Sequence, residues 1–372
     1  MRRDIAIIGG GIVGSAIARQ LAVHNPTKSI VVIEKHEEAG RETSTKNSGV
    51  IHSGIHQNPS FLKTRLAVRG SALTKAYARM YGVPMMHCGM IIPVLPSTFF
   101  ERDWWGKIKE LYGFISRAKT CGVRISYRTS RGVKKLEPHL RSIGGLFLPD
   151  VAVIDQDAFV RSMYNQAKRY GVSFLFQSKV SEITYGTHYT ITAGATTVHA
   201  NTLINAAGLY ADEIARMAGI NQYTIYPWRG EYYEVSQAKR SLISRLVYFP
   251  PSPRAAFKGI HFSPRPDGRL YLGPNARLMQ SKEDYQSDKT PASVFHNAVH
   301  RFCPSLEVSD LTWAYAGMRA RRVATEHDAD YLIRVDRVSP PLINLIGIDS
   351  PGVGSATAIG EYVADLSQGL KN

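Results

Sequence analysis

The chain has 372 residues, of which 44% are hydrophobic, 20% charged and 10% aromatic. This is the composition of a globular protein, and it excludes a disordered, collagen-like or coiled-coil chain. At roughly 150 residues per domain, the length suggests about two or three structural units. No uncharged apolar run reaches the roughly 18 residues of a membrane span, so we expect no transmembrane helix. Cys88, Cys121 and Cys303 are odd in number and far apart, so we expect a reducing compartment and neither a disulfide framework nor a structural zinc site.

Basic residues outnumber acidic residues by 46 to 30, which gives a formal net charge of +16. Such an excess favours polyanions, anionic membranes or small acidic substrates as partners. The excess is concentrated in residues 101–141, which contain 11 basic and 4 acidic residues, a net +7. Because Trp104, Trp105, Tyr112 and Phe114 lie among these charges, the segment is either a solvated face or a membrane-surface patch. No nucleic-acid-binding motif is present, so we expect no nucleic-acid partner.

The first elements in chain order predict a β–turn–α–β unit. Gly9, Gly11 and Gly14 have the spacing GxGxxG and follow a short apolar run. That run is too short for the hydrophobic region of a signal peptide, and we interpret it as a buried strand. The unit consists of a strand at 4–9, a helix at 12–25 and a second strand at 29–34.

This unit is typical of dinucleotide binding. Gly9 makes the tight turn, Gly11 lets the backbone approach a pyrophosphate, and Gly14 lets the helix pack closely on the strand. The N-terminus of the helix then presents unpaired N–H groups to the phosphates. Glu34 ends the second strand, 20 residues after Gly14, where its carboxylate can accept hydrogen bonds from ribose hydroxyls. A glutamate at this position repels a 2′-phosphate, so NADP is disfavoured.

Three further segments favour FAD over NAD. Small polar residues at 40–49 offer backbone and hydroxyl donors to a second length of phosphate and ribityl chain. Residues 205–208 end a strand with three small residues, which allows close approach of the backbone. Residues 350–355 lead from the last strand into a helix, whose N-terminus can stabilise negative charge on a reduced flavin.

The elements after the first unit are of two kinds, nucleotide-binding elements and β-rich blocks. We expect helices at 59–81, 104–121, 157–170, 209–218, 294–302 and 355–366, and strands at 89–94, within 172–192, and at 202–207, 223–235, 246–250, 259–264, 269–272 and 342–348. Nucleotide-binding elements at the start, middle and end predict an α/β fold. A discontinuous Rossmann-like FAD-binding domain would carry an inserted α+β substrate domain built on a largely antiparallel sheet. The expected domains are 1–82, 141–220 and 323–372 for FAD, and 83–140 and 221–322 for the substrate.

Several segments, spread in order over nearly the whole chain, resemble a known family. They are residues 47–55 (NSGVIHSGI), 229–233 (RGEYY), 259–262 (GIHF), 272–276 (LGPNA), 316–320 (AGMRA) and 347–352 (GIDSPG). On these segments the chain resembles the FAD-dependent oxidoreductases of the D-amino-acid oxidase and glycerol-3-phosphate dehydrogenase type. Within that group it resembles the L-2-hydroxyglutarate dehydrogenases and oxidases. The resemblance implies oxidation of L-2-hydroxyglutarate, or a similar 2-hydroxy acid, to 2-oxoglutarate, with hydride transfer to N5 of the flavin.

Binding of a substrate carboxylate calls for a positioned arginine, because a guanidinium can donate two parallel hydrogen bonds to it. Arg319 lies where the family places an arginine above the flavin; the alternative is a basic surface turn. A dicarboxylate needs a second cationic or hydroxyl contact, for which Arg229, Tyr232 and Tyr233 are candidates.

Loss of the hydroxyl proton calls for a general base that titrates near neutral pH, which points to histidine. His52, His56 and His261 lie in or beside the family segments. His261 belongs to an expected strand with polar neighbours and is the first candidate for the base, followed by His56 and His52. The alternative for His52 is a hydrogen bond to the backbone of the flavin-contacting loop. No metal is required by this chemistry, and no HxH or HExxH cluster is present.

We expect the FAD cofactor to contact residues from every segment of the FAD-binding domain. They are Gly9, Gly11, Ile12, Val13, Gly14, Glu34, Lys35, Thr43, Ser44, Asn47, Ser48, Gly49, Val50, Val180, Ala206, Ala207, Gly208, Gly317, Arg319, Gly352, Val353, Gly354 and Ser355.

Two other functions are compatible with the sequence. One keeps the fold and changes the substrate to an amino acid or glycerol phosphate; the other is a non-catalytic flavin-binding module. A binding module would leave the flavin oxidised with every hydroxy or amino acid.

Oxygen, a quinone and a carrier protein all remain open as electron acceptors. We expect a cytoplasmic location, with peripheral attachment to the inner face of the membrane as the alternative.

Overall fold

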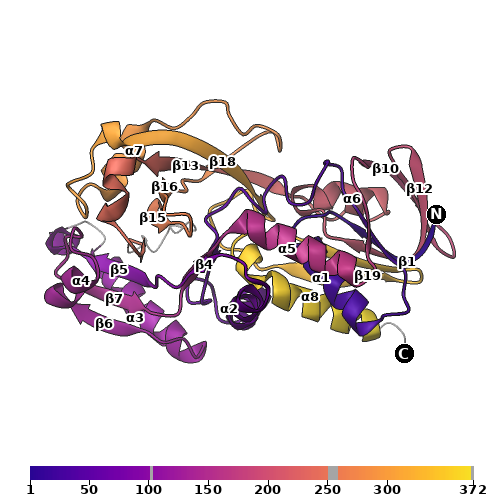
Figure 1. Cartoon of the computed structure of the whole chain (residues 1–372), viewed down its shortest axis with the longest axis horizontal. Helices are drawn as coiled ribbons and strands as arrows, with labels where there is room; N and C mark the ends of the chain where they lie inside the picture. The colour runs from indigo at the N-terminus through magenta and orange to yellow at the C-terminus, as the bar shows by residue number, and fades with distance from the viewer. Residues whose placement is uncertain (101–103, 250–258, 370–372) are drawn as a thin grey trace.

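The computed structural model describes residues 1–100, 104–249 and 259–369, and within them the chain folds around two large sheets and one small sheet. Figure 1 shows the first large sheet at one end of the molecule, beside α1 and α8, and the second at the other end. Among the described residues, no helix combines the length and the hydropathy that crossing a membrane requires.

The first sheet contains the strands that surround the N-terminal glycine turn. Its order is β10-β11-β12-β1-β2-β9, and β20 pairs with both β12 and β19. Strands β9, β2, β1, β12 and β20 run parallel to one another, which is the doubly wound arrangement expected from the sequence. The strands are β1 (Arg2–Ile8), β2 (Ile30–Ile33), β9 (Ser173–Leu175), β10 (Val180–Tyr185), β11 (Tyr189–Ala193), β12 (Thr196–Asn205), β19 (Leu332–Val338) and β20 (Pro341–Ile346).

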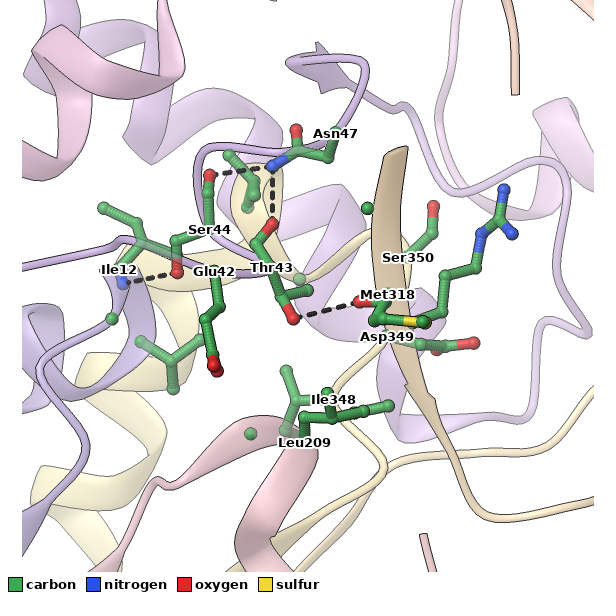
Figure 2. Close-up of a pocket in the computed structure, with 18 of the residues that line it drawn as sticks. Ile12, Glu42, Thr43, Ser44, Asn47, Leu209, Met318, Ile348, Asp349 and Ser350 are labelled. Atoms are coloured by element: carbon green, nitrogen blue, oxygen red, sulfur yellow. Dashed lines mark hydrogen bonds between the residues drawn. The ribbon is translucent and has the colours of Figure 1, made fainter. Parts of the chain in front are cut away.

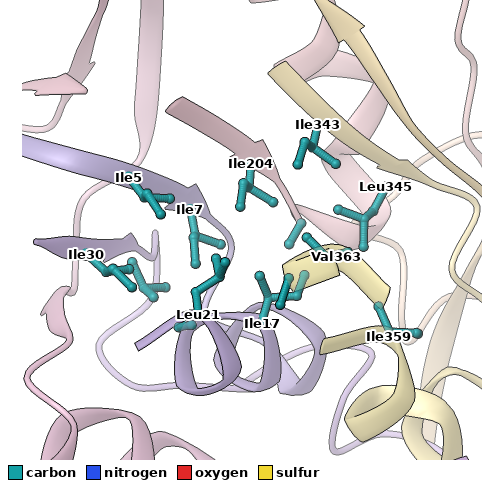
Figure 3. Close-up of a cluster of buried hydrophobic side chains, with 14 of the residues drawn as sticks. Ile5, Ile7, Ile17, Leu21, Ile30, Ile204, Ile343, Leu345, Ile359 and Val363 are labelled. Carbon is teal, nitrogen blue, oxygen red and sulfur yellow. The ribbon is translucent and has the colours of Figure 1, made fainter. Parts of the chain in front are cut away.

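Both faces of this sheet are buried, which explains why its central strands are continuously apolar. Ile5 and Ile7 of β1 face a core shared with α1 and α8, as Figure 3 shows. Ala6 and Ile8 point to the opposite face and pack into a second core. This alternation is the period of two of a β-strand. All four residues of β2 are buried as a result.

Helices cover this sheet and connect it to the rest of the chain. Helix α8 packs on both α1 and α2. The helices are α1 (Ile12–His24), α2 (Leu62–Tyr81), α3 (Trp104–Thr120), α4 (Ser130–Leu136), α5 (Gln156–Arg169), α6 (Ala211–Met217), α7 (Ala292–Val299) and α8 (Gly352–Gly369). Short 3-10 turns are η1 (Pro96–Phe100), η2 (Gly208–Tyr210), η3 (Gln237–Leu242) and η4 (Val308–Asp310).

The second sheet is largely antiparallel, in the order β17-β13-β16-β15-β14-β5-β7-β6, with β18 paired to the other edge of β13. The single parallel pair among the described strands of this sheet joins β14 to β5. The strands are β5 (Met90–Val94), β6 (Ser126–Thr129), β7 (Gly144–Leu148), β13 (Tyr226–Val235), β14 (Leu246–Val247), β15 (His261–Pro264), β16 (Leu270–Gly273), β17 (Arg277–Leu278) and β18 (Leu311–Arg321). The expected strand at 246–250 ends in a residue outside the described part of the chain.

The small sheet joins the two halves and shifts the expected domain boundaries. Its strands are β3 (Val50–Ile51), β4 (Met85–Met86) and β8 (Ala152–Ile154), in the order β3-β8-β4. Strand β4 lies after the expected boundary at residue 83 and still pairs with β8. Strand β7 lies after the expected boundary at residue 141 and yet belongs to the second sheet. Boundaries inferred from local composition miss these pairings because the partners are distant in sequence.

Candidate active site

A cavity of about 420 Å³ lies where the first and second sheets meet, within the size range of small-molecule sites. Its lining comes from the glycine turn after β1, from residues 40–50, from the turn after β12, from β18 and from the start of α8. These segments are far apart in the sequence and are the ones expected to hold a dinucleotide. The structure therefore brings the expected FAD segments together around one space.

The glycine turn has the geometry that its spacing predicts. Gly9 has φ +107°, and a Cβ at this position would lie 2.4 Å from the carbonyl oxygen of Ala206. A Cβ on Gly14 would lie 1.9 Å from the carbonyl oxygen of Gly9. Only glycines allow the end of β1, the start of α1 and the end of β12 to meet so closely. Gly14 itself packs beneath the turn and does not line the cavity.

Glu34 closes the turn from the side of β2. Its Oε2 accepts a hydrogen bond from the Gly10 N–H (2.7 Å), and its Oε1 accepts one from the His36 N–H (2.9 Å). The side chain is buried and lines the cavity. Each carboxylate oxygen retains a lone pair for a further donor, so the group can also accept hydrogen bonds from ribose hydroxyls.

Residues 40–49 form a loop that Figure 2 shows between the start of α1 and strand β18. Ser44 Oγ accepts a hydrogen bond from the Ile12 N–H (3.0 Å), and Thr43 Oγ1 donates one to the Met318 carbonyl (2.9 Å). Asn47 Nδ2 donates to the carbonyls of Thr43 (2.9 Å) and Ser44 (2.7 Å). The loop is thus tied to α1 and to β18, while its residues still line the cavity.

The C-terminal helix contributes its first turn to the same cavity. Gly352 and Val353 line it, as expected for residues facing the flavin. Gly354 lies outside the lining, and its carbonyl accepts a hydrogen bond from Thr74 Oγ1 of α2 (3.0 Å). Ser355 is fully buried and also lies outside the lining. The close-packed glycine turn, the buried carboxylate and this helix N-terminus together fit a dinucleotide cofactor.

The cavity lining also includes Arg319, the expected carboxylate ligand. Its Nη2 donates a hydrogen bond to the Asn275 carbonyl (3.1 Å), and the side chain lines the cavity. Burial lowers the pKa of the Arg319 guanidinium, which the nearby Tyr232 and Asp349 oppose. Since the ordinary pKa of arginine is above about 12, the group keeps its charge at neutral pH.

The three candidate histidines gather around one tyrosine. The ring of Tyr248 stacks on His261 (3.9 Å between centroids) and lies 5.5 Å from His56 and 6.0 Å from His52. All four side chains line the cavity. Burial raises the pKa of Tyr248 well above its usual value, so its hydroxyl stays protonated at neutral pH. Tyr248 was not singled out from the sequence because no motif marks it.

Two expected substrate contacts lie away from the cavity. Arg229 is fully buried; its Nη1 forms an ion pair with Asp284 (3.3 Å), and its Nη2 donates to the Asp288 carbonyl (3.0 Å). Tyr233 donates its hydroxyl to the Thr290 carbonyl (2.6 Å). Neither residue lines the cavity, so their expected role as substrate ligands is wrong for this geometry.

Tyr232, the residue between them in the motif, does line the cavity, because neighbouring side chains of a strand point to opposite faces. Its hydroxyl lies 2.9 Å from Ser48 Oγ, within hydrogen-bonding distance. Burial raises the pKa of the Tyr232 phenol, so it is a neutral donor or acceptor.

A buried ion network forms another part of the lining that sequence patterns did not reveal. Lys63 of α2 is 1% exposed; its Nζ lies 2.9 Å from Asp328 Oδ1 and 3.2 Å from Asp349 Oδ1. Burial opposes its charge, but Asp349 and Asp328 outweigh this effect, and the pKa of Lys63 is raised. A lysine near the start of an amphipathic helix is usually solvated, so nothing local signals this burial.

Residues 4–366 match the family described as FAD dependent oxidoreductase, and the chain belongs to that family. The chain is therefore an FAD-dependent enzyme, and the expected family, cofactor and α/β fold are confirmed.

The L-2-hydroxyglutarate dehydrogenase, mitochondrial, of Caenorhabditis elegans is 29% identical over 97% of this chain and 92% of its own length. The protein of the same name from Bos taurus is 29% identical over 98% of this chain and 88% of its own. A solved structure, dithionite-reduced L-alpha-glycerophosphate oxidase from Mycoplasma pneumoniae with FAD bound, is 26% identical with a TM-score of 0.88. That match covers 99% of this chain and 95% of the other.

We predict that Gly317→Ala weakens FAD binding. A Cβ at Gly317 would lie 1.8 Å from the Lys46 carbonyl oxygen, so the cavity loop must move. Overpacking of this kind costs about 1–3 kcal/mol, or about 5- to 150-fold in the Kd for FAD. Titration of apoprotein with FAD, followed by flavin fluorescence, measures the change. Gly186→Ala is the control because its Cβ meets open space; equal Kd values for the two variants would contradict the prediction.

Proposed function

We propose that the protein oxidises L-2-hydroxyglutarate, or a close 2-hydroxy acid, to the 2-oxo acid. The observation that carries this proposal is that Arg319 lines the same cavity as His52, His56 and His261. A carboxylate ligand and candidate bases are thereby available in the same cavity as the glycine turn. The names of the relatives from Caenorhabditis elegans and Bos taurus support the same substrate.

Arg319 would bind the C1 carboxylate, because its planar guanidinium donates two parallel hydrogen bonds and fixes the orientation of C2. Its other contact, the Asn275 carbonyl, holds the guanidinium in place. Tyr232, Lys63 and Arg321 also line the cavity and are candidates for the second carboxylate. Arg319 in the lining and the net charge of +16 both favour an acidic substrate.

His261 would remove the hydroxyl proton. Its Nδ1 lies 3.0 Å from the Gly259 carbonyl, and a carbonyl only accepts hydrogen bonds, so Nδ1 carries the proton. In the neutral ring Nε2 then has the lone pair that a general base needs. Stacking on Tyr248 fixes the ring plane. Bound FAD supplies the hydride acceptor for C2.

A substrate panel tests the proposal. Purified holoenzyme is assayed with an artificial electron acceptor and L-2-hydroxyglutarate, D-2-hydroxyglutarate, lactate, glycine and sn-glycerol 3-phosphate. We expect L-2-hydroxyglutarate to give the highest kcat/KM and 2-oxoglutarate as product. The likeness to the glycerophosphate oxidase makes glycerol 3-phosphate the second candidate, and a higher kcat/KM for it would replace the proposal. No turnover with any member would favour the non-catalytic flavin-binding module.

We predict that Arg319→Lys impairs substrate use much more than FAD binding. Lysine keeps the charge but loses the planar fork. Loss of a charge-assisted hydrogen bond costs about 1.5–3 kcal/mol, or about 10- to 150-fold in kcat/KM. Steady-state kinetics and FAD titration separate the two effects. An unchanged kcat/KM for L-2-hydroxyglutarate would remove Arg319 from the substrate site.

We predict that His261→Gln lowers kcat by about 100- to 10,000-fold, the range for loss of a general base. The acidic limb of the pH profile of kcat/KM, which reports protonation of the base, should disappear with it. His24→Gln is the matched control, because His24 is exposed at the end of α1. If His261→Gln keeps both kcat and the acidic limb, we expect His56 or His52 to be the base instead.

We further propose that α3 faces an anionic membrane. This helix buries only Phe114 and Ala118, whereas Trp105 and Tyr112 are each 69% exposed. Trp105, Lys109 and Tyr112 follow one another at helical spacing, so aromatic and basic side chains share the exposed face. Such a face suits an anionic lipid surface. Residues 101–103 of the basic segment lie outside the described part of the chain.

Docking there would bring lipid close to the cavity, because Glu110 and Phe114 of the same helix line it. A lipid-soluble quinone as the electron acceptor would fit this arrangement, while oxygen and a carrier protein remain the alternatives.

We predict that the protein co-sediments with anionic vesicles at low salt and much less with neutral ones. Each Lys or Arg near the surface contributes about 1 kcal/mol, and salt screens this attraction. The double variant Trp105→Ala/Lys109→Glu should lose most of the binding. Tyr170→Ala, which removes an exposed aromatic ring elsewhere, is the control. Equal partition of the parent protein to neutral and anionic vesicles would contradict the prediction and show that this face is an ordinary solvated surface.

A further inference from the structure

Residues 279–290, here called the strap, connect β17 to α7 and cross from the second sheet to helix α6. Glu283 of the strap lines the cavity, together with Lys35, Glu42, Tyr210 and Glu213. Lys35 directly follows Glu34 and contacts both Glu42 and the Tyr210 ring, so this part of the lining adjoins the expected ribose site. The strap thus leads out of the second sheet and contributes Glu283 to the cavity that is expected to hold FAD.

One end of the strap is anchored by the segment RGEYY of β13. Arg229 binds Asp284 and the Asp288 carbonyl, as described above. Glu231 Oε1 accepts a hydrogen bond from the Thr290 N–H (3.0 Å). Tyr233 donates to the Thr290 carbonyl. The buried charges of this motif, which the substrate site does not use, therefore hold the strap in place.

The strap contacts the FAD-binding side through an ion pair of Lys282, while Met279 and Tyr285 pack against the buried cluster around Leu209. Lys282 Nζ lies 2.6 Å from Asp212 Oδ1 and 2.6 Å from Glu213 Oε1, both on α6. Its side chain is 16% exposed and that of Asp212 is 6% exposed. Asp212 is itself fixed, because its Oδ2 accepts a hydrogen bond from the Ile225 N–H (3.0 Å).

The electrostatic surroundings tie this contact to the cavity. Lys35 lies 3.5 Å from the centroid of the Tyr210 ring, and its Nζ pairs with Glu42 (2.8 Å). Burial, together with Glu42, Glu283 and Glu213, raises the pKa of the Tyr210 phenol. Carboxylates that lie this close together repel one another unless cations pair with them. Lys282 is one such cation, and it comes from the strap on the other side of the junction.

We propose that Lys282 is a positioning residue for the cofactor: it clasps the strap to α6 and closes the dinucleotide part of the cavity, so that FAD is released only when this ion pair opens. An ion pair that exists only in the closed form shifts the equilibrium toward that form by its own free energy. The clasp therefore slows FAD release without contributing to the substrate end, where Arg319 and His261 lie.

The test measures FAD release from the holoenzyme by the rise of flavin fluorescence after dilution. Lys282→Ala should release FAD about 5- to 30-fold faster, which corresponds to the loss of about one or two kcal/mol. Lys282→Arg keeps the charge and should restore a rate near that of the parent. Lys289→Ala removes an exposed lysine of the same strap that does not contact α6, and it should leave the rate unchanged. Release from the parent should accelerate with salt, while release from Lys282→Ala should not.

The melting temperature of the apoproteins separates a clasp from a general structural role. We expect at most a small decrease for Lys282→Ala, because Asp212 keeps its hydrogen bond from the Ile225 N–H and Glu213 is 41% exposed. A parent-like release rate for Lys282→Ala, or a rate that rises only in proportion to a lowered apoprotein melting temperature, would overturn the proposal. The outcome is independent of the substrate, since no turnover is measured.

Discussion

The active-site arrangement depends on the close contact between Gly317 of β18 and the carbonyl oxygen of Lys46. A side chain at 317 would occupy the space of that oxygen, so only glycine lets the second sheet approach the loop that lines the FAD cavity. Side chains two apart on a strand share a face, so Arg319 faces the cavity as well. Met318 and Ala320 alternate with them and belong to a buried cluster that includes Leu209, although both also line the cavity. One backbone contact thus sets both how the second sheet meets the loop and where Arg319, the proposed carboxylate ligand, lies.

The charges around the cavity follow from the same join. Arg319 and Arg321 come from β18, Lys63 from α2 and Asp349 from the segment that leads into α8. Burying such groups is costly unless they are paired, and Lys63 meets two carboxylates. The pairing keeps Lys63 charged in a buried place, although its two carboxylate partners offset its positive charge. Arg319 and Arg321 bring positive charge to the lining, whereas the wall under the strap contains Glu42, Glu213 and Glu283, which Lys35 and Lys282 partly balance.

Local patterns predicted the first unit and several strands of the second sheet, but not the contacts that depend on residues distant in sequence. The glycine spacing, the apolar run of β2 and Glu34 lie within a short stretch, and their geometry depends on near neighbours. Arg229 was misassigned, because its burial depends on a strap more than 50 residues further on. Tyr248 was missed, since its contact with the histidines depends on pairing of β14 with β5 and β15. Strand β18 was also not expected, because Gly317 interrupts its strand pattern. The glycine is required by a close contact with Lys46, which is distant in sequence.

The central claim is that Arg319 and His261 present C2 of an L-2-hydroxy acid for hydride transfer to bound FAD. Anaerobic stopped-flow absorbance of the flavin tests it most directly, with L-2-hydroxyglutarate carrying hydrogen or deuterium at C2. The account predicts bleaching of the oxidised flavin bands by the L-enantiomer alone, slowed by deuterium at C2, with one 2-oxoglutarate formed per flavin. A flavin that stays oxidised with L-2-hydroxyglutarate but is bleached by glycerol 3-phosphate or an amino acid would contradict it.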